Sequence, residues 1–558
     1  MAHDLVIRGG TIVDGTSRPP YAADIALSDG RIAEIGRRLD GRDTIDAAGR
    51  LVTPGFIDLH THYDPQVLWD PWLTPSSHLG VTSVIAGNCS FSIAPCAPEM
   101  RASMMRTMEA VEDMRVATLA AGVEWSFETY PEYLDTIRRQ GIALNYSGFV
   151  GHTAVRQWVM GDAAFDRAAT DDEILRMRAV VADALRAGAI GFSFDRSPSH
   201  RGDGGRRVPS VVASQTEVEA LMMVTRDLGR GVIQCSPGED FHWLYEFQAR
   251  LGRPITWTSI LAFPPGNTAR AHWADKIAFH RQHGVDQGRR VYPQVTCRRV
   301  TATIKLTNPA TFTMVPAWGE MMAIPRTLQR AAFADPAWRA RAWAETDSGR
   351  YLDLRWSHFT VEESRSAPQC NGVSIEQLAR DSGKNPVEVM CDLALADDLE
   401  TTFGVIFAND DPVELGALLQ SPGVVLGLSD AGAHVGQLCD ATLPVDFLAT
   451  WIRDRELMSL EAGVHKLTGE PAALLELTDR GRLTVGARAD VVVLDWATLD
   501  AGPVQRVRDL PGDTDRLVAH QPRGIAHVIV NGVAIRHDNI PAKLDRLPGQ
   551  ILDNGARP

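Results

Sequence analysis

The middle of the chain alternates short apolar runs with segments of helical periodicity. The runs, in chain order, are GFIDLH, VTSVIAG, ALNYSGFVGH, GAIGFSF, GVIQCS, PITWTSI, RVYPQVT and VVLGLSD. Among the segments between them, Asp171–Ala187 places Ile174, Met177, Val181 and Leu185 on one helical face. Strands that alternate with helices predict βαβ units and a parallel sheet. Eight such strands predict an α/β fold, a distorted TIM-like (β/α)8 barrel with catalytic groups at its C-terminal strand ends.

The two ends of the chain have a different pattern, in which short β-branched runs are separated by Gly, Asn or Asp. Ser28-Asp29-Gly30 and Asn531-Gly532 are hairpin signals near the N-terminus and the C-terminus. The runs ADVVVLD and IAHVIVNGVAIRH supply further strands near the C-terminus. Because chain termini often lie close together, we expect residues 1–56 and 479–558 to form one small β-sandwich domain.

The barrel is expected to span residues 57–478, and it contains one unusually long connection. Residues 298–409 exceed ordinary loop lengths between the seventh and the eighth strand. We therefore expect a helical insertion here that covers the mouth of the barrel.

Composition narrows the class of protein. Hydrophobic residues make up 44% and charged residues 23% of the 558 positions, as in a globular chain with a sizeable core. The net charge of -14 argues against a nucleic-acid binder, and no apolar run reaches the length of a membrane helix. Seven scattered cysteines and an N-terminus without a signal-peptide pattern favour the cytoplasm. The expected partner is a small molecule, and self-association into a homo-oligomer stays open.

The strongest chemical signal is the run Asp58-Leu59-His60-Thr61-His62 at the end of the first barrel strand. Residues two apart on a strand point the same way, so His60 and His62 both face the barrel mouth. Two converging imidazoles suit Zn²⁺ or a similar divalent ion. The alternative is a pair of structural histidines, because this spacing alone is a weak signal.

Further motifs occur in order along nearly the whole chain, from Leu5 to about Ile535. LVTPGFIDLHTHYD is followed by GNCSFS, GHTAVR, GLSDAGAH, LTGEPAALLEL and DRGRLTVGARADVVVLD. The set resembles the amidohydrolase superfamily, and GNCSFS with GHTAVR resembles its N-acyl-D-amino-acid deacylase (D-aminoacylase-like) branch. The resemblance implies a metal-dependent hydrolase that cleaves a carbon–nitrogen amide bond in a small substrate, with N-acyl-D-amino acids the nearest candidates.

The resemblance also implies roles for single residues. Asp430, at the end of the eighth strand, corresponds to a metal ligand that is also the general base, which takes a proton from water and returns it to the leaving amine. Cys89, after the second strand, corresponds to a metal ligand that replaces the carboxylated lysine of other superfamily members. Residues 1–275 contain no lysine, so a carboxylated lysine from the third or fourth strand is excluded. A buried structural thiol is the alternative for Cys89.

The fifth and sixth strands depart from the family pattern, in which each supplies one histidine to the tightly held metal. Here they read VIQCS at 232–236 and ITWTS at 255–259. Gln234 is a feeble ligand, and Cys235 is an unproven substitute. We therefore expect one tightly held divalent ion, zinc before others, with the donors His60, His62, Cys89 and Asp430.

Substrate-binding residues are expected in the loops that follow the strands. His152 in the GHTAVR motif can donate to a substrate carbonyl, and Arg156 can pair with a carboxylate, with a surface salt bridge as the alternative. Other polar residues that follow strand ends are Tyr63, Arg196, His200, Arg201 and His434. The basic pair Arg298-Arg299 follows the seventh strand, where it could hold an anionic group or be solvated.

Other functions stay open from the sequence. The same metal and base would serve ring opening of a cyclic amide or imide, or a deamination that releases ammonia. A protein of another class, a binder that kept the barrel but lost metal ligands, is favoured by the changed fifth and sixth strands. Retention of His60, His62, Cys89 and Asp430 together favours the enzyme.

Overall fold

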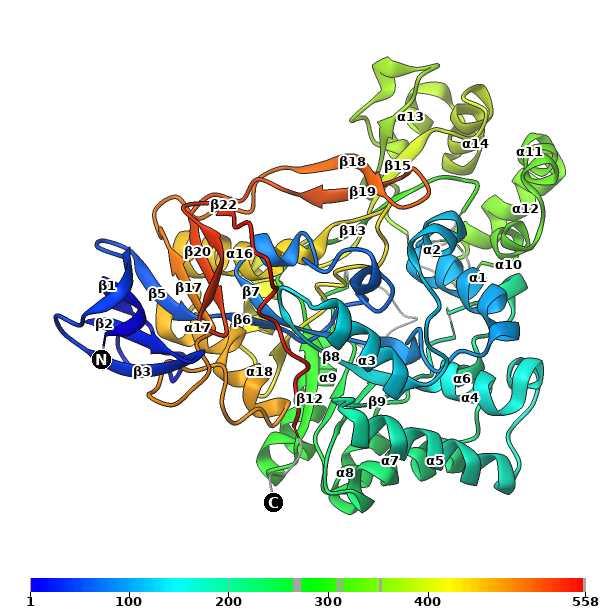
Figure 1. Ribbon diagram of the computed structural model, residues 1–558. Helices are drawn as coiled ribbons and strands as arrows, with labels where there is room; N and C mark the ends of the chain where they lie inside the picture. Colours follow the sequence, from blue (N-terminus) through cyan, green and yellow to red (C-terminus); the bar gives the residue numbers. More distant parts are fainter. Residues whose placement is uncertain are drawn as a thin grey trace.

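A computed structural model of the chain (Figure 1) describes residues 2–198, 200–263, 272–308, 312, 315–350 and 354–554. Its central unit alternates strands with helices, and strands from both chain ends form a second sheet beside it. No helix among these residues is long and apolar enough to cross a membrane.

The central unit is a parallel sheet whose strands follow one another in chain order. Within the described residues it has eight strands, β6 (Phe56–Asp58), β7 (Val81–Ala86), β8 (Asn145–Gly151), β9 (Gly191–Asp195), β10 (Val232–Ser236), β11 (Ile255–Trp257), β12 (Val291–Val295) and β16 (Val425–Leu426). Each coincides with one of the eight apolar runs of the sequence, so the strand prediction is confirmed. Almost every residue of these strands is buried, as expected of a parallel sheet covered on both faces.

The first and last strands of this sheet are joined just beyond their C-terminal ends. Thr61, after β6, forms a parallel bridge with Ala431, after β16, and the His62 N–H donates to the Ala431 carbonyl over 2.7 Å. The strand order and this junction are those of a (β/α)8 barrel type. The segments that carry His62 and Ala431 therefore lie side by side.

Helices connect the successive strands. They are α1 (Arg101–Glu112), α2 (Val116–Gly122), α3 (Tyr130–Gln140), α4 (His152–Met160), α5 (Asp171–Ala187), α6 (Pro209–Val212), α7 (Gln215–Asp227), α8 (Trp243–Leu251), α9 (Trp273–His283) and α15 (Pro412–Leu419), with α16 (Leu443–Asp446), α17 (Leu460–Leu467) and α18 (Gly469–Leu474) after β16. The bounds of α5 are those predicted from its apolar face. Thr170 and Glu173 form a capping box at its start, and Gly188, with a φ of 118°, ends it.

Strands from both chain ends share the second sheet. In the part of the chain that the structure describes, its nine strands are β1 (His3–Ile12), β2 (Tyr21–Ser28), β3 (Arg31–Gly36), β4 (Gly41–Asp46), β5 (Leu51–Pro54), β17 (Val491–Leu494), β20 (Ile525–Val530), β21 (Val533–His537) and β22 (Ile540–Pro541). β5 pairs antiparallel with β17, which joins the two ends. Both predicted hairpins are present, as β2–β3 and β20–β21. The sandwich packing and the domain boundaries stay predictions.

The long connection between β12 and β16 holds strands as well as helices. Its three-stranded sheet has the order β13 (Val300–Ile304), β15 (Thr402–Ala408), β14 (Phe359–Glu363). Its helices are α10 (Pro316–Gly319), α11 (Arg326–Ala334), α12 (Pro336–Asp347), α13 (Ile375–Ser382) and α14 (Pro386–Ala396). These elements enclose a hydrophobic cluster of their own, which includes Trp318, Phe333 and Phe403. The sequence pattern did not predict the sheet. The helices lie within residues 298–409, and an insertion that covers the mouth of the barrel stays a prediction.

The loop that follows β16 is held by two other parts of the chain. One is a C-terminal hairpin made of β18 (Val504–Leu510) and β19 (Thr514–Ala519), seen above the other C-terminal strands in Figure 1. From this hairpin, the Leu517 N–H donates to the Val435 carbonyl over 2.7 Å. From the insertion, the Thr303 N–H donates to the Gln437 carbonyl over 3.0 Å. The loop is therefore fixed by main-chain bonds on both sides.

The shared terminal sheet gives a stability prediction. Ile529 on β20 is fully buried in one cluster with the N-terminal residues Ile25 and Val52. Because truncation removes buried methyl groups and leaves a cavity, we expect Ile529→Ala to lower the free energy of unfolding by about 2–5 kcal/mol in urea denaturation. The control Val533→Ala, on an exposed position of β21, should change it by less than about 0.5 kcal/mol. Equal losses in both variants would show that this cluster does not tie the ends together.

Candidate metal centre and active site

A pocket of about 220 Å³ opens at the C-terminal ends of the central strands. His60 and His62 follow β6, Cys89 follows β7 and Asp430 follows β16, and all four line this pocket. Other lining residues include Glu112, His200, Ser236, Glu239, Thr258, Lys276 and His434. In barrels of this type the active site lies at these strand ends. The pocket is therefore the candidate active site.

The imidazole of His60 is buried and held on both of its nitrogens. Its Nδ1 lies 2.8 Å from Gln294 Oε1, while the Gln294 amide nitrogen donates to the Thr256 hydroxyl. Since Gln294 Oε1 can only accept, Nδ1 of His60 carries the proton. The other nitrogen, Nε2, lies 3.4 Å from Cys89 Sγ and 3.2 Å from Asp430 Oδ1. Burial lowers the pKa of His60 although Asp430 opposes it, so the neutral ring presents a lone pair to the pocket.

His62 faces the same space from two positions further along the chain. Its ring centroid lies 5.3 Å from that of His60, and its Nε2 lies 3.9 Å from Asp430 Oδ1. Its Nδ1 lies 3.4 Å from Oε1 of Glu112, the last residue of α1. Burial and the neighbouring His60 hold the pKa of His62 well below its usual range. His62 is therefore also neutral and free to bind a cation through Nε2.

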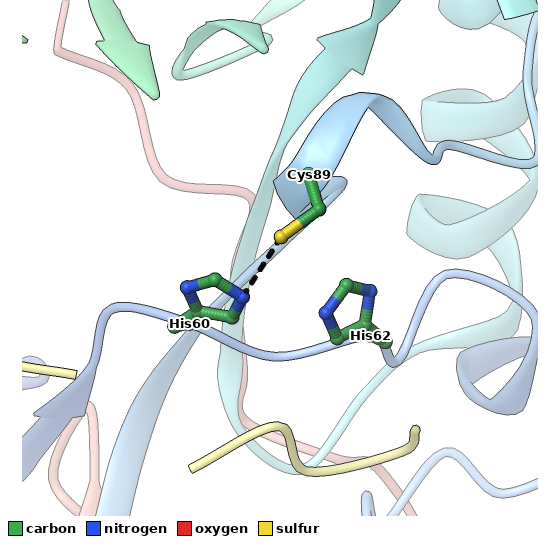
Figure 2. Close-up of side chains that lie close together, drawn as sticks. All are labelled: His60, His62 and Cys89. Atoms are coloured by element: carbon green, nitrogen blue, oxygen red, sulfur yellow. Dashed lines mark hydrogen bonds between the residues drawn. The ribbon is translucent and has the colours of Figure 1, made fainter. Parts of the chain in front are cut away.

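Cys89 brings a sulfur atom to the two imidazoles, as Figure 2 shows. It has a φ of 54° in the left-handed region, and its N–H donates to Gln234 Oε1 over 2.7 Å. The ligand atoms of His60, His62 and Cys89 lie within 4.8 Å of one another. Burial raises the pKa of the thiol, so its ionisation needs a bound cation as partner.

Asp430 lies in a left-handed backbone conformation, which residues other than glycine rarely adopt. Asp430 and His434 have φ values of 44° and 50°. The neighbouring Ser429 hydroxyl donates to the His60 carbonyl over 2.9 Å and ties this segment to the first strand. Two imidazoles, a thiol and a carboxylate that converge in this way form a donor set that fits zinc.

His200 and His434 complete the histidines of the pocket. His200 Nδ1 lies 2.8 Å from Oδ2 of Asp195, the last residue of β9. Burial disfavours the charge of His200, but Asp195, together with Glu112 and Asp430, outweighs it and raises the pKa. His434 donates its N–H to the Glu112 carbonyl over 2.5 Å. The structure thus brings both residues into the pocket that the sequence predicted for them.

His152 and Arg156 lie elsewhere. Both side chains are fully buried beside Glu217 of α7, with His152 Nε2 3.0 Å and Arg156 Nη1 2.5 Å from its carboxylate. His152 Nδ1 lies 3.0 Å from the Ser210 hydroxyl. Burial by itself raises the pKa of Glu217, but bonds from His152 and Arg156 outweigh it and lower the pKa to about 2. This geometry is at odds with the substrate role predicted for His152 and Arg156, and we assign both to the internal support of the barrel.

The remaining sequence candidates also have partners outside the described lining of the pocket. Tyr63 is fully buried, with its hydroxyl 2.8 Å from that of Ser76. Arg196 donates to the Ala213 carbonyl over 2.5 Å. Arg201 is exposed, and Arg298 lies 3.1 Å from Asp440. Each follows a strand end as predicted, but none of the four belongs to the described lining of the pocket.

The fifth and sixth strands contribute polar groups in place of histidine. Gln234 accepts the Cys89 N–H, so it positions a candidate ligand. Thr258 and Ser236 line the pocket and lie 2.8 Å apart through their hydroxyls. Cys235, the substitute ligand considered from the sequence, is fully buried and does not belong to the described lining.

Several residues of the site were not predicted from the sequence. Gln294 could have been found, because it is a polar residue inside the apolar run RVYPQVT. Glu112, Glu239 and Lys276 could not, because they belong to helices or loops whose ends reach the pocket only in the folded chain. Asp195 directly follows the run GAIGFSF, and its position at a strand end was the available signal.

Comparison with known proteins places this site in a family. The Amidohydrolase family model matches residues 43–335 and 364–536, which is most of the chain. The chain belongs to the amidohydrolase family. This amidohydrolase is a metal-dependent hydrolase that acts on carbon–nitrogen bonds, other than peptide bonds, in small substrates.

Relatives of known activity match along the whole length. N-acyl-D-glutamate deacylase of Alcaligenes xylosoxydans xylosoxydans is 30% identical over 573 residues, which cover 99% of this chain and 97% of that protein. The solved N-acyl-D-glutamate deacylase of Bordetella bronchiseptica, complexed with zinc and a phosphonate that mimics the tetrahedral intermediate, is 25% identical with a TM-score of 0.67, over 100% of both chains. The D-aminoacylase-like branch predicted from the motifs is confirmed.

A solved D-aminoacylase, also 25% identical with a TM-score of 0.67, covers 99% of this chain and 100% of its own. That protein is described as having a binuclear metal centre with one-metal activation and second-metal attenuation. A binuclear centre that one metal activates is therefore known in a relative, and the number of ions that this amidohydrolase binds depends on its own donor residues.

The buried cluster of His152, Arg156 and Glu217 gives a prediction about stability. Removing the Glu217 charge leaves the buried Arg156 guanidinium without a counter-charge. We therefore expect Glu217→Gln to lower the free energy of unfolding by about 3–5 kcal/mol at pH 7. Because the folded-state pKa of Glu217 is lowered to about 2, the ionised group stabilises the fold above its ordinary pKa. That contribution is lost as the pH falls toward about 2, so the gap between variant and wild type should shrink below about pH 5 in urea denaturation.

The control is Glu219→Gln, on the same helix but partly exposed, which should have little effect at any pH. A Glu217→Gln variant of unchanged stability that loses substrate affinity would contradict the structural role and restore the role in binding.

Proposed function

We propose that this amidohydrolase is an N-acyl-D-amino-acid deacylase that uses one tightly bound divalent ion, zinc before others. The observation that carries the proposal is the convergence of His60, His62, Cys89 and Asp430 on one pocket at the strand ends. Similarity to a deacylase along nearly the whole chain supports the substrate class. The bond cleaved is the amide between the acyl group and the nitrogen of the amino acid.

Asp430 is the proposed general base. Its Oδ1 lies near Nε2 of both His60 and His62, so it reaches the point at which these donors would hold an ion. The ion, when bound, polarises the amide carbonyl and lowers the pKa of water. Asp430 takes the proton of the attacking water and hands it to the departing amine, which leaves poorly as an anion. His60, His62 and Cys89 hold the centre in place while this proton moves.

The substrate is oriented by two cationic groups of the pocket. His200, held through Nδ1 by Asp195, has its Nε2 left to donate to the acyl carbonyl. Lys276 of α9 is buried in the pocket wall, with its Nζ 3.1 Å from Glu239. An ammonium has three donors, so Lys276 can bind the carboxylate of an N-acyl amino acid while it keeps Glu239. Lys276 takes the role that sequence analysis gave to Arg156.

The proposed count of one ion follows from the donors. A catalytic zinc needs three protein donors and a position left for water, and it can expand to five-coordinate, so His60, His62, Cys89 and Asp430 are enough for one ion. The fifth and sixth strands offer Gln234 and Thr258 where the family pattern has histidines, and the amide and hydroxyl are poor zinc ligands. The described lining holds further donors in Glu112, His200, Glu239 and His434. Glu112 faces His62, His200 is held by Asp195 and Glu239 by Lys276, so a second ion would have to compete with these partners.

We also propose three features of the architecture and location of this amidohydrolase. They are a closed barrel over residues 57–478, a β-sandwich from residues 1–56 and 479–558, and a cytoplasmic location. The Thr61–Ala431 bridge supports the closed barrel, and the pairing of β5 with β17 supports the terminal unit.

A substrate panel tests the reaction class. Purified enzyme is given N-acyl-D-amino acids, their L-enantiomers, cyclic imides and amino-purines, each with and without a chelator. Deacylation releases a free amino acid, ring opening releases no amine, and deamination releases ammonia. Chelator-sensitive release of D-amino acids, restored by zinc, supports the proposal. Turnover of cyclic imides or amino-purines alone contradicts it, and turnover of nothing while zinc is bound favours the binding protein.

Substitution of the base gives a prediction about activity. Because an amide cannot carry the proton between water and amine, we expect Asp430→Asn to lower kcat by at least about 10²–10⁴-fold in steady-state assays. Asp454→Asn, at an exposed position, is the control and should keep the wild-type rate. An Asp430→Asn variant with wild-type kcat and metal content would show that another group is the base.

The donor set gives a prediction about metal content. After dialysis we expect one zinc per chain by elemental analysis, and we expect His60→Ala to lose it together with turnover, because a ligand is removed. His242→Ala, an exposed histidine at the start of α8, should keep both. Two tightly held ions per chain, both required for turnover, would refute the single-ion site.

A further inference from the structure

Glu112 is a buried carboxylate whose position is unusual for an acidic side chain. It ends α1, it lines the candidate active site, and its side chain is only 3% exposed. Among the described residues, its carboxylate makes an ion-pair contact with His62, whose Nδ1 lies 3.4 Å from Glu112 Oε1. An acidic group in such a place is costly unless a specific partner uses it.

His62 needs a partner on the nitrogen that Glu112 faces. Nδ1 of His62 is buried and has no hydrogen bond among the described residues. A neutral imidazole carries one proton, and the nitrogen that binds a cation must be the bare one. Since Nε2 is the nitrogen beside Asp430, the proton belongs on Nδ1. Glu112 Oε1 is the acceptor placed to receive it.

His60 has the same arrangement with a different acceptor. Gln294 Oε1 lies 2.8 Å from its Nδ1, which leaves Nε2 toward Cys89 and Asp430. Both imidazoles are thus backed by an oxygen on Nδ1 and present Nε2 to one point. The two acceptors differ in kind, because Gln294 offers an amide oxygen and Glu112 offers a carboxyl oxygen.

The end of α1 also holds the loop that carries the base. The Glu112 carbonyl accepts the His434 N–H over 2.5 Å, and Asp113 Oδ2 accepts the Gly436 N–H over 3.2 Å. His434 and Gly436 belong to the loop that begins with Asp430. One helix end therefore contacts the His62 segment through the Glu112 side chain, and it contacts the Asp430 loop through the Glu112 carbonyl and the Asp113 side chain.

We infer that Glu112 is a positioning residue for the metal centre: it accepts the Nδ1–H of His62 and thereby fixes Nε2 as the metal-binding nitrogen. This inference rests on the proposed function, because it assigns His62 as a ligand. Acceptors of this kind set the orientation of a ligating histidine and increase its basicity, and their loss costs about 10–100-fold in metal affinity or activity.

The experiment measures zinc dissociation constants by competition with a chromogenic chelator. The proteins are the full-length wild type, Glu112→Leu and Glu112→Gln, with circular dichroism and thermal melting to establish that each is folded. Glu112→Leu removes the acceptor and should weaken zinc binding by about 10–100-fold. Glu112→Gln keeps an oxygen, but it replaces the carboxyl by an amide, a weaker acceptor, so it should fall between Leu and the wild type. Glu109→Gln, one turn earlier on the exposed face of α1, is the matched control and should bind as the wild type does.

The outcomes separate the inference from the proposed function. A graded loss of zinc affinity, wild type over Gln over Leu, supports the role of Glu112. A zinc dissociation constant equal to that of the wild type in either folded variant overturns it, even if the melting temperature falls. Wild type that binds zinc but hydrolyses no N-acyl amino acid overturns the proposed substrate alone, and the comparison of affinities still decides the role of Glu112. Wild type that binds no zinc overturns both.

Discussion

The hydrogen bond from the His62 N–H to the Ala431 carbonyl is the contact on which the site depends. It joins the segment after the first strand to the segment after the eighth, and the Ser429 hydroxyl strengthens the junction at the His60 carbonyl. Main-chain groups thus bring two histidines to a carboxylate from far along the sequence. Because the fold fixes this approach, short side chains are enough to gather the donor atoms. Cys89 then reaches the same point from the second strand, through backbone of positive φ that Gln234 holds.

The strands could be predicted because a strand buried on both faces is a short, mainly apolar run, and such runs recur here between segments of helical periodicity. The helix Asp171–Ala187 could be predicted with its ends, since Thr170 and Gly188 supply caps that the sequence displays. The sheet of the insertion could not. Its outer strands are largely polar or partly exposed, and they pair only with β15, which lies far from β13 in the chain. Pairing at that distance leaves no local pattern to detect.

The site residues also divide into those that the sequence predicts and those that it does not. His60, His62, Cys89 and Asp430 could be predicted because their positions at strand ends and their family motifs agree. Tyr63 and Arg156 occupy equally suggestive positions, yet one bonds to Ser76 and the other to Glu217. A place at a strand end gives the location of a backbone atom and leaves the direction of a long side chain undetermined. Glu112 is the opposite case, a site residue without any signal in the sequence. Only the packing of α1 against the barrel mouth shows that it contacts His62.

The pairing of β5 with β17 has a consequence for synthesis on the ribosome. The first five strands emerge early, but the partner of β5 is translated only after the entire barrel. At ordinary elongation rates the edge of β5 waits for roughly 20 to 90 s before β17 exists. During that interval it offers unpaired backbone groups to any extended chain, including another nascent copy. Slow translation or crowded polysomes would therefore favour aggregation through the N-terminal strands. The cause would be the order in which the strands are synthesised.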